Sequence, residues 1–267
     1  MKKIIFTSAI LLLLLNSFKI TGFDEKLQKI PLQDVDLCKF LYLENQSYNL
    51  TINEFEVSSL ITFKEYKVFL AEMKNILSEI QYLSLFPDSN MINSSIYQKY
   101  INSIEYDNMP VVGISWDNAM KYCKWLTFKN NEKENIKYIY RLPTLPEYLT
   151  AYNHLMRSNT NIDFNKTFAD WLLNANDNFT NYNYMEYGDK YFNYYYFHQA
   201  NDVQILKTKM VFGNNFIYKR NQLKQNSELI YYANEGYKHI AFRIVKVDLL
   251  KSRNSENQIV LKYWEEN

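Results

Sequence analysis

Glycine and proline are scarce in this chain, and this scarcity most limits what it can fold into. Five glycines and five prolines are present in 267 residues, whereas an average protein holds about 12% of the two together. Loops that wrap a phosphate need glycine because the backbone must approach the ligand closely. Neither G-x-G-x-x-G nor G-x-x-x-x-G-K-[ST] occurs. Glycine-loop, collagen-like and proline-rich architectures are therefore excluded.

The remaining composition predicts a folded chain that does not bind nucleic acid. Hydrophobic residues reach 47% and aromatic residues 17%, which is enough apolar surface to offset the entropy lost on folding. Lys and Arg total 30 against 29 for Asp and Glu, so the net charge is +1. No excess of positive charge is available to hold a polyanion.

Residues 1–22 have the layout of a secretory signal peptide. Lys2 and Lys3 precede an apolar run over 4–15, which is shorter than the roughly 20 residues that a transmembrane helix needs. We expect no retained transmembrane helix and a mature protein that is secreted or periplasmic. No cysteine that a lipoprotein would acylate stands at the end of this run.

The chain has two cysteines, Cys38 and Cys123. An even number permits one disulfide in an oxidising compartment. Cys123, however, falls on the buried face of a predicted helix, where a thiol behaves as a small apolar group. Two unpaired cysteines are the favoured interpretation, and a bridge is the alternative.

The first part of the mature chain predicts one strand followed by one helix. The opening segment, 23–49, has no clear period apart from a short candidate strand at 40–43. Alternation over 54–57 predicts a half-buried strand, and apolar residues at three- and four-residue spacings predict a helix that begins at Thr62. Residues 76–77 extend this helix in the prediction.

A second helix is predicted after a β-prone run at 110–114, whereas 87–109 is predicted to be irregular surface. Ser115 is placed to cap this helix, and Asp117 suits the helix dipole in its first turn. The predicted buried face holds Ala119, Tyr122, Cys123 and Leu126. Lys121 and Lys124 are predicted to point away from it.

The remainder predicts one more helix and several strands. A strand at 138–140 leads to a helix opened by Thr144 and Glu147 as a capping box, with Pro146 in the first turn. The best later strand candidates are 168–171, 209–212 and 239–245. Residues 248–267 form a charged C-terminal tail or a packed terminal helix, and 50–247 reads as one domain.

Several strings in this domain resemble the formylglycine-generating enzyme (sulfatase-modifying factor) family. The most specific are Pro-Val-Val-Gly-Ile-Ser-Trp-Asp-Asn-Ala-Met-Lys-Tyr-Cys-Lys-Trp-Leu over 110–126 and Arg-Leu-Pro-Thr-Leu-Pro-Glu-Tyr over 141–148. Phe-Ala-Asp-Trp over 168–171, Val-Phe-Gly-Asn-Asn-Phe over 211–216 and Ala-Phe-Arg-Ile-Val over 241–245 are similar to later motifs of the family. The likeness covers about 50–247.

This resemblance implies a C-type-lectin-like α+β fold with two main helices, small antiparallel sheets and much irregular chain. The pattern of predicted elements agrees with the α+β class. Most motif residues read as packing groups, namely Trp116, Trp125, Leu142 and Trp171. Arg141 and Arg243 are expected to hold loops by hydrogen bonds to backbone carbonyls.

Catalytic members of the family carry two cysteines shortly after the glycine and aromatic turn, and their thiolates bind copper. Soft thiolates select copper(I) and cannot be exchanged for hydroxyl or amide groups. The corresponding stretch here, 215–225, contains no cysteine. We therefore expect no formylglycine-generating activity, no catalytic residues and no copper.

Other cofactors have weak support in the sequence. Iron-dependent members use a histidine cluster, but His154, His198 and His239 are isolated along this chain. Structural calcium is an open alternative, because Asn, Asp and backbone oxygens over 174–177 could contribute ligands. A solvated loop is the favoured interpretation of that stretch, and the pair Glu54 and Glu56 is interpreted as solvated charge rather than an acid–base pair.

Three functions compete, and one of them is a ligand-binding protein for a small sugar or peptide. The leading hypothesis is a non-catalytic module with a structural or binding role in a bacterial envelope, with an envelope protein or glycan as partner. The family includes lipoproteins of the gliding-motility and type IX secretion machinery, which suggests outer-membrane association. The alternative is an enzyme with altered chemistry in the family's cleft. By analogy with that cleft, the expected binding residues are Asn215, Tyr218 and Arg220; Tyr194, Tyr195 and Tyr196 form a further candidate patch.

Overall fold

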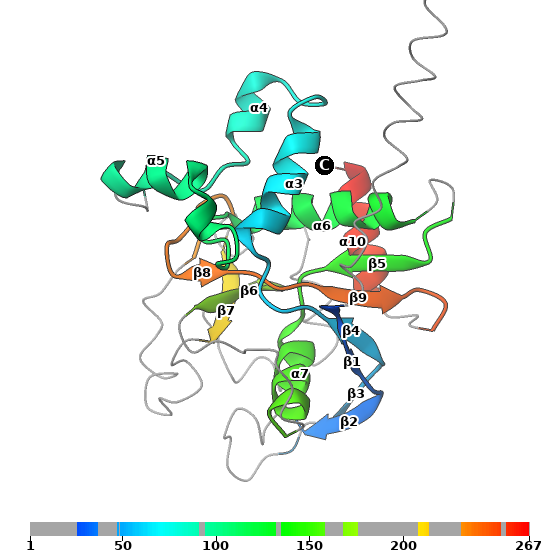
Figure 1. Ribbon diagram of the computed structural model, residues 1–267. Coiled ribbons are helices and arrows are strands. Elements are labelled where there is room, and N and C mark those ends of the chain that lie inside the picture. Colours follow the sequence, from blue (N-terminus) through cyan, green and yellow to red (C-terminus); the bar gives the residue numbers. More distant parts are fainter. Residues whose placement is uncertain are drawn as a thin grey trace, which may run out of the picture.

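The computed structural model describes the chain over nine stretches, which are 26–36, 47, 49–90, 94–131, 135–157, 168–175, 208–213, 231–251 and 255–266. Within these residues the fold is mixed α+β, with small sheets and six α-helices (Figure 1). Helices α3 (Phe63–Met73), α6 (Trp116–Asn130) and α7 (Leu145–Arg157) form where the sequence predicts helices, and α6 and α7 are the two longest of the six. The predicted α+β class is confirmed at this level.

A four-stranded antiparallel sheet forms the centre of the domain, in the order β1-β4-β9-β5. Its strands are β1 (Gln28–Ile30), β4 (Phe55–Val57), β9 (Val245–Asp248) and β5 (Tyr138–Arg141). Residues from both ends of the chain therefore meet in one sheet. A separate antiparallel pair joins β2 (Gln33–Asp36) to β3 (Asn49–Ile52).

Helix α6 (Trp116–Asn130) packs against β5 and against α3 (Phe63–Met73). Both helices begin where the sequence predicts, because Ser115 accepts from the Asn118 amide and Thr62 forms a capping box with Glu65. The predicted buried face of α6 is confirmed. Lys124 is an exception to the predicted outer face, since it is half-buried and donates to the carbonyl of Trp264.

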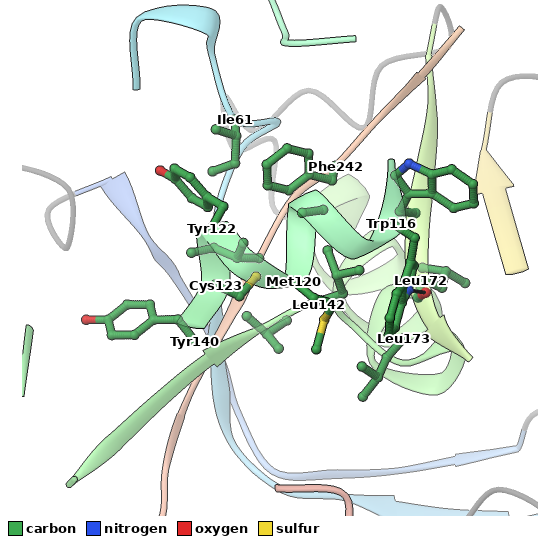
Figure 2. Packing of buried hydrophobic residues seen from close by; sticks show 14 of the residues in the cluster. Ile61, Trp116, Met120, Tyr122, Cys123, Tyr140, Leu142, Leu172, Leu173 and Phe242 are labelled. Carbon is green, nitrogen blue, oxygen red and sulfur yellow. Dashed lines mark hydrogen bonds between the residues drawn. The ribbon is translucent and has the colours of Figure 1, made fainter. Parts of the chain in front are cut away.

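The core collects the large aromatic residues of the motifs (Figure 2). Trp116 donates from Nε1 to the Leu172 carbonyl at 2.8 Å, and Trp171 donates to the Ile114 carbonyl at 2.9 Å. Each indole therefore fills volume and satisfies a buried polar group at once. The packing role predicted for Trp116, Trp125, Leu142 and Trp171 is confirmed.

The predicted strand at 110–114 does not form. Pro110 makes a single bridge to Thr62. Gly113 has φ +77°, a left-handed conformation that ends any extended strand. Its carbonyl instead accepts from the Asp88 amide, and its own amide donates to Tyr237.

The strand predicted at 239–245 is split in two. Its first part is β8 (Ile240–Ala241), which pairs in parallel with β6 (Ala169–Ala175), and its second part belongs to β9 in the central sheet. Between them, the Ile61 amide donates to Phe242 and the Ser58 amide donates to Ile244. A third strand, β7 (Lys209–Gly213), pairs with β6, so this sheet is mixed rather than antiparallel.

The segment predicted to be irregular over 87–109 contains helix α5 (Ser94–Asn102) and the 3-10 turn η2 (Ile104–Tyr106). Before it, α3 ends at Met73, so 76–77 do not extend it, and a capped short helix follows, α4 (Glu79–Leu83). These helices project to one side of the central sheet (Figure 1). We refer to residues 68–109 as the helical arm.

The last two helices lie against the central motifs. α7 (Leu145–Arg157) opens with the predicted Thr144 and Glu147 capping box. α10 (Ser255–Glu266) buries Asn257, Val260 and Trp264. Of the two alternatives for the C-terminal residues, a charged tail or a packed helix, the packed helix is correct over 255–266.

Candidate functional site

The binding residues expected by analogy, Asn215, Tyr218 and Arg220, lie outside the described residues. So do the patch Tyr194, Tyr195 and Tyr196, the thiol of Cys38 and the ring of His198. The described residues that border 214–230 are Gly213, at the end of β7, and Tyr231. Gly213 has φ +110°, and a Cβ there would lie 3.1 Å from the Tyr148 hydroxyl, so this position needs glycine.

The chain that follows this segment forms a loop over 231–239, which backbone hydrogen bonds join to four other regions. The Tyr231 carbonyl accepts from Lys209 at 2.9 Å, and the Ala233 carbonyl accepts from Asp117 at 3.0 Å. The Tyr237 and His239 carbonyls accept from Gly113 and Ala169. We call residues 231–239 the aromatic loop.

Side chains of the aromatic loop make hydrogen bonds and ring contacts with one another. The Tyr231 hydroxyl lies 3.1 Å from His239 Nε2, and the Tyr237 hydroxyl donates to Glu235 at 2.8 Å. The rings of Tyr231 and Tyr237 meet edge to face with centroids 5.0 Å apart. Burial raises the pKa of Tyr237 to about 12, and burial together with Lys238 lowers the pKa of His239. The phenol and imidazole are therefore both neutral near pH 7.

Lys209 lies beneath this loop at the start of β7. Its side chain is buried, and Nζ lies 4.1 Å from the centre of the Trp116 ring. Burial lowers the pKa of Lys209 to about 8, although the neighbouring Asp117 acts in the opposite direction. Burial also raises the pKa of Asp117. The sequence predicts a strand at 209–212, but it does not predict that the Lys209 side chain is buried.

Lys209→Met is expected to change how stability depends on pH. Between pH 8 and the ordinary lysine pKa of 10.5, the native protein has lost this proton while the unfolded chain still binds it. The wild type therefore gains stability relative to the variant as pH rises, by up to about 3 kcal/mol. Urea unfolding of both proteins at about pH 7 and about pH 10 measures this difference. Parallel pH profiles would contradict it.

Arg243 and Asp170 form a buried ion pair that joins β6 to the chain between β8 and β9. Nε and Nη2 of Arg243 donate to the two carboxylate oxygens, each at 3.1 Å, and the Tyr148 ring lies 5.6 Å from the guanidinium carbon. Burial raises the pKa of Asp170, and Arg243 and the Tyr148 hydroxyl oppose this rise. Nη1 of Arg243 also donates to the Ser58 carbonyl at 3.5 Å, as expected, whereas the carboxylate of Asp170 is a partner that the expectation did not include.

Arg141 is the second buried arginine, and it also pairs with a carboxylate. Its two terminal nitrogens donate to Glu147 at 2.7 Å, and Nε donates to Asn257 of α10 at 2.8 Å. One backbone bond, to the Leu142 carbonyl at 3.1 Å, matches the prediction. The family motif and the C-terminal helix are thus joined through one guanidinium group.

The described residues do not fit the two-thiolate copper site that the resemblance implies. Cys123 is a free and fully buried thiol, packed in the core between α6 and β5 (Figure 2). Burial raises the pKa of the Cys123 thiol well above its usual range, so it does not supply a thiolate. The prediction that Cys123 is unpaired is confirmed.

Other metal sites have no support in the described part of the chain. No group of three or more His, Cys, Asp or Glu side chains gathers there. Asn174, a calcium candidate, is buried in β6, and its Oδ1 accepts from the Leu145 amide at 2.9 Å, where it caps α7. The interpretation of this residue as part of a solvated loop is therefore wrong; 176–177 lie outside the described residues.

Glu54, just before β4, and Glu56, within β4, both form surface ion pairs. Glu54 contacts Lys29 and Lys251, and Glu56 lies 3.9 Å from Lys246. Hydrogen bonds from Lys251 and Lys29 lower the pKa of Glu54 to about 2. A carboxyl group that stays ionised at neutral pH cannot serve as a general acid.

Comparison with known families finds one match, which covers somewhat less than half of the chain. Residues 33–157 match the family model of the sulfatase-modifying factor enzyme 1-like domain. This match includes both of the specific motif strings, whereas the strings at 168–171, 211–216 and 241–245 lie beyond it. No curated protein matches the chain. In the described residues, no helix is long and apolar enough to cross a membrane.

Proposed function

Because this chain carries a sulfatase-modifying factor domain over residues 33–157, we propose that it is a non-catalytic member of that group. In this proposal it works as a structural or binding module outside the cytoplasm, in a bacterial envelope. Its partner is an envelope protein or glycan. We propose further that the protein works as part of gliding-motility or type IX secretion machinery.

The observation that supports the proposal is the position and burial of the cysteines. The stretch 215–225 contains none, and Cys123 is a core thiol whose pKa is raised by burial. A copper(I) site of the kind that the family uses needs two accessible thiolates. The domain framework is thus retained without the groups that perform the family's oxidation.

Exposed apolar residues on the helical arm support a binding role. Seven large hydrophobic side chains of this arm are exposed, namely Val68, Ile76, Ile80, Leu83, Ile96, Ile104 and Met109. Helix α4 buries none of its residues, and its order comes from the capping box of Ser78 and Gln81. Seven of the twelve exposed large hydrophobic side chains of the described residues thus belong to this arm, and exposed apolar surface is a feature of protein contact sites.

One observation favours the alternative of an enzyme with altered chemistry. Lys209 is a buried amine whose pKa is lowered to about 8 by burial, next to Asp117. Buried lysines of this kind act as bases or nucleophiles in some enzymes.

Retention of formylglycine chemistry itself is tested by incubating the purified protein with copper, oxygen and a cysteine-containing sulfatase peptide. Mass spectrometry is expected to show no conversion of the cysteine, and conversion would overturn the proposal.

Site-specific photo-crosslinking tests the binding role directly. A photoreactive residue at Ile80, which is 83% exposed, is compared with one at Leu250, which is 81% exposed and lies outside the arm. In cells that naturally make the protein, we expect a discrete crosslinked species from position 80 and none from position 250. Equal labelling at the two positions, or labelling at neither, would count against a binding role for the arm.

A further inference from the structure

Strand β5 lies at one edge of the central sheet. In the described residues it has one strand neighbour, β9, on one side only. The backbone groups on the other side of an edge strand can pair with a strand of a second molecule unless other groups occupy them. We infer that Thr127 of α6 and Asn131 at the end of that helix form an edge lock, which keeps a second copy of this chain from pairing with β5.

The edge lock reproduces the hydrogen bonds of a neighbouring strand. The Tyr140 amide donates to Oγ1 of Thr127 at 2.9 Å, and the same hydroxyl donates to the Tyr140 carbonyl at 3.3 Å. The Tyr138 amide donates to Oδ1 of Asn131 at 3.0 Å, and Nδ2 of Asn131 donates to the Tyr138 carbonyl at 2.8 Å. Alternate residues of an antiparallel strand turn both backbone groups to the same side. Tyr138 and Tyr140 are therefore the residues whose backbone groups face away from β9.

The spacing of the two locking residues matches the spacing of the groups that they bind. Thr127 and Asn131 are four positions apart, so they lie on one face of the helix and are separated by a rise of about 6 Å. Two residues of a strand span about 6.6 to 6.8 Å, which is the step from Tyr138 to Tyr140. Nδ2 of Asn131 also donates to the Thr127 carbonyl at 2.7 Å, and this bond ties the two locking residues together.

The two edges of the sheet are protected in different ways. At the far edge, β1 is three residues long and has the exposed Lys29 at its centre, and both features discourage strand addition. At the near edge, β5 has the β-prone sequence Tyr-Ile-Tyr-Arg. Two copies of β5 related by a two-fold axis would offer each other the same N–H and C=O groups. Thr127 is fully buried and Asn131 is half-buried, so the lock that prevents this pairing is part of the packed fold.

Amide hydrogen exchange followed by NMR tests the lock at each position. In the wild type we expect slow exchange at Tyr138 and Tyr140, because both amides donate to side chains within the fold. Asn131→Ala should speed exchange at Tyr138 by at least about tenfold and leave Tyr140 slow, and Thr127→Val should do the reverse. Thr127→Ser keeps the hydroxyl and is the matched control. Fast exchange at both amides in the wild type, or unchanged exchange in the two variants, would overturn the inference.

Self-association of the double variant Thr127→Val with Asn131→Ala tests the consequence. Light scattering after size-exclusion chromatography should show more dimer or larger species than the wild type forms at the same concentration. Adding Tyr138→Pro should reverse this association, because proline has no amide to pair and is tolerated on the outer side of an edge strand. A double variant that keeps its circular dichroism and associates no more than the wild type would contradict the lock, as would association that survives Tyr138→Pro. If the double variant does not fold, Asn131→Ala alone takes its place in the same comparison.

Discussion

Asp170→Asn is expected to destabilise the protein by about 3 to 5 kcal/mol. Asp170 and Arg243 are both almost completely buried, and the carboxylate accepts two hydrogen bonds from the guanidinium group. The amide removes the countercharge and leaves a buried cation, whose desolvation is then uncompensated. Urea unfolding followed by circular dichroism measures the loss, as a lower midpoint at unchanged slope.

The double variant Asp170→Leu with Arg243→Met is the control for this prediction. It removes both charges together, so it should lose less stability than Asp170→Asn alone. If the single variant is as stable as the wild type, the buried ion pair does not contribute as its geometry indicates. If the double variant is the less stable of the two, the loss comes from packing rather than from the unpaired charge.

Arg141→Lys is expected to destabilise the protein by about 3 kcal/mol or more, despite the retained charge. Lysine cannot reproduce the planar fork that donates twice to Glu147 and once more to Asn257. The variant therefore weakens the start of α7 and the attachment of α10 in one step. Thermal and urea unfolding measure the loss, and limited proteolysis should show earlier release of α10. Wild-type stability in Arg141→Lys would contradict this role.

The same ion pair predicts an acid dependence. Burial by itself would raise the pKa of Glu147, but Arg141 and the hydrogen bonds from Thr144 outweigh it, so the pKa is lowered. A lowered folded-state pKa stabilises the protein above the unfolded value of 4.5, and this stability is lost as pH falls through the folded pKa. Glu147→Gln removes this contribution, so its stability should fall less steeply below pH 4.5 than that of the wild type.

Local chemistry made several elements predictable. Ser115, Thr62 and the pair Thr144 and Glu147 mark the starts of α6, α3 and α7, because each cap is completed within three residues. Periodicity identified the buried face of α6, including Cys123. The core role of the tryptophans also followed from residue type, since a large apolar ring has few alternatives to burial.

Other elements depended on contacts between distant residues. The strand predicted at 239–245 is divided because Arg243 turns to Asp170, and hydrogen bonds from 58–61 replace its ladder. Helix α5 was missed because its stretch has a polar composition. For the site, Asp170, Lys209 and the aromatic loop could not be recognised from sequence, because no spacing rule connects them.

The sequence by itself determined the α+β class, the starts of the main helices and the lack of cysteine over 215–225. These properties are fixed by residue type and by neighbours within a few positions. The tertiary structure alone decided which charges are buried together and which distant segments donate hydrogen bonds to the aromatic loop. These depend on which distant segments meet, and burial then sets their hydrogen bonds and pKa values.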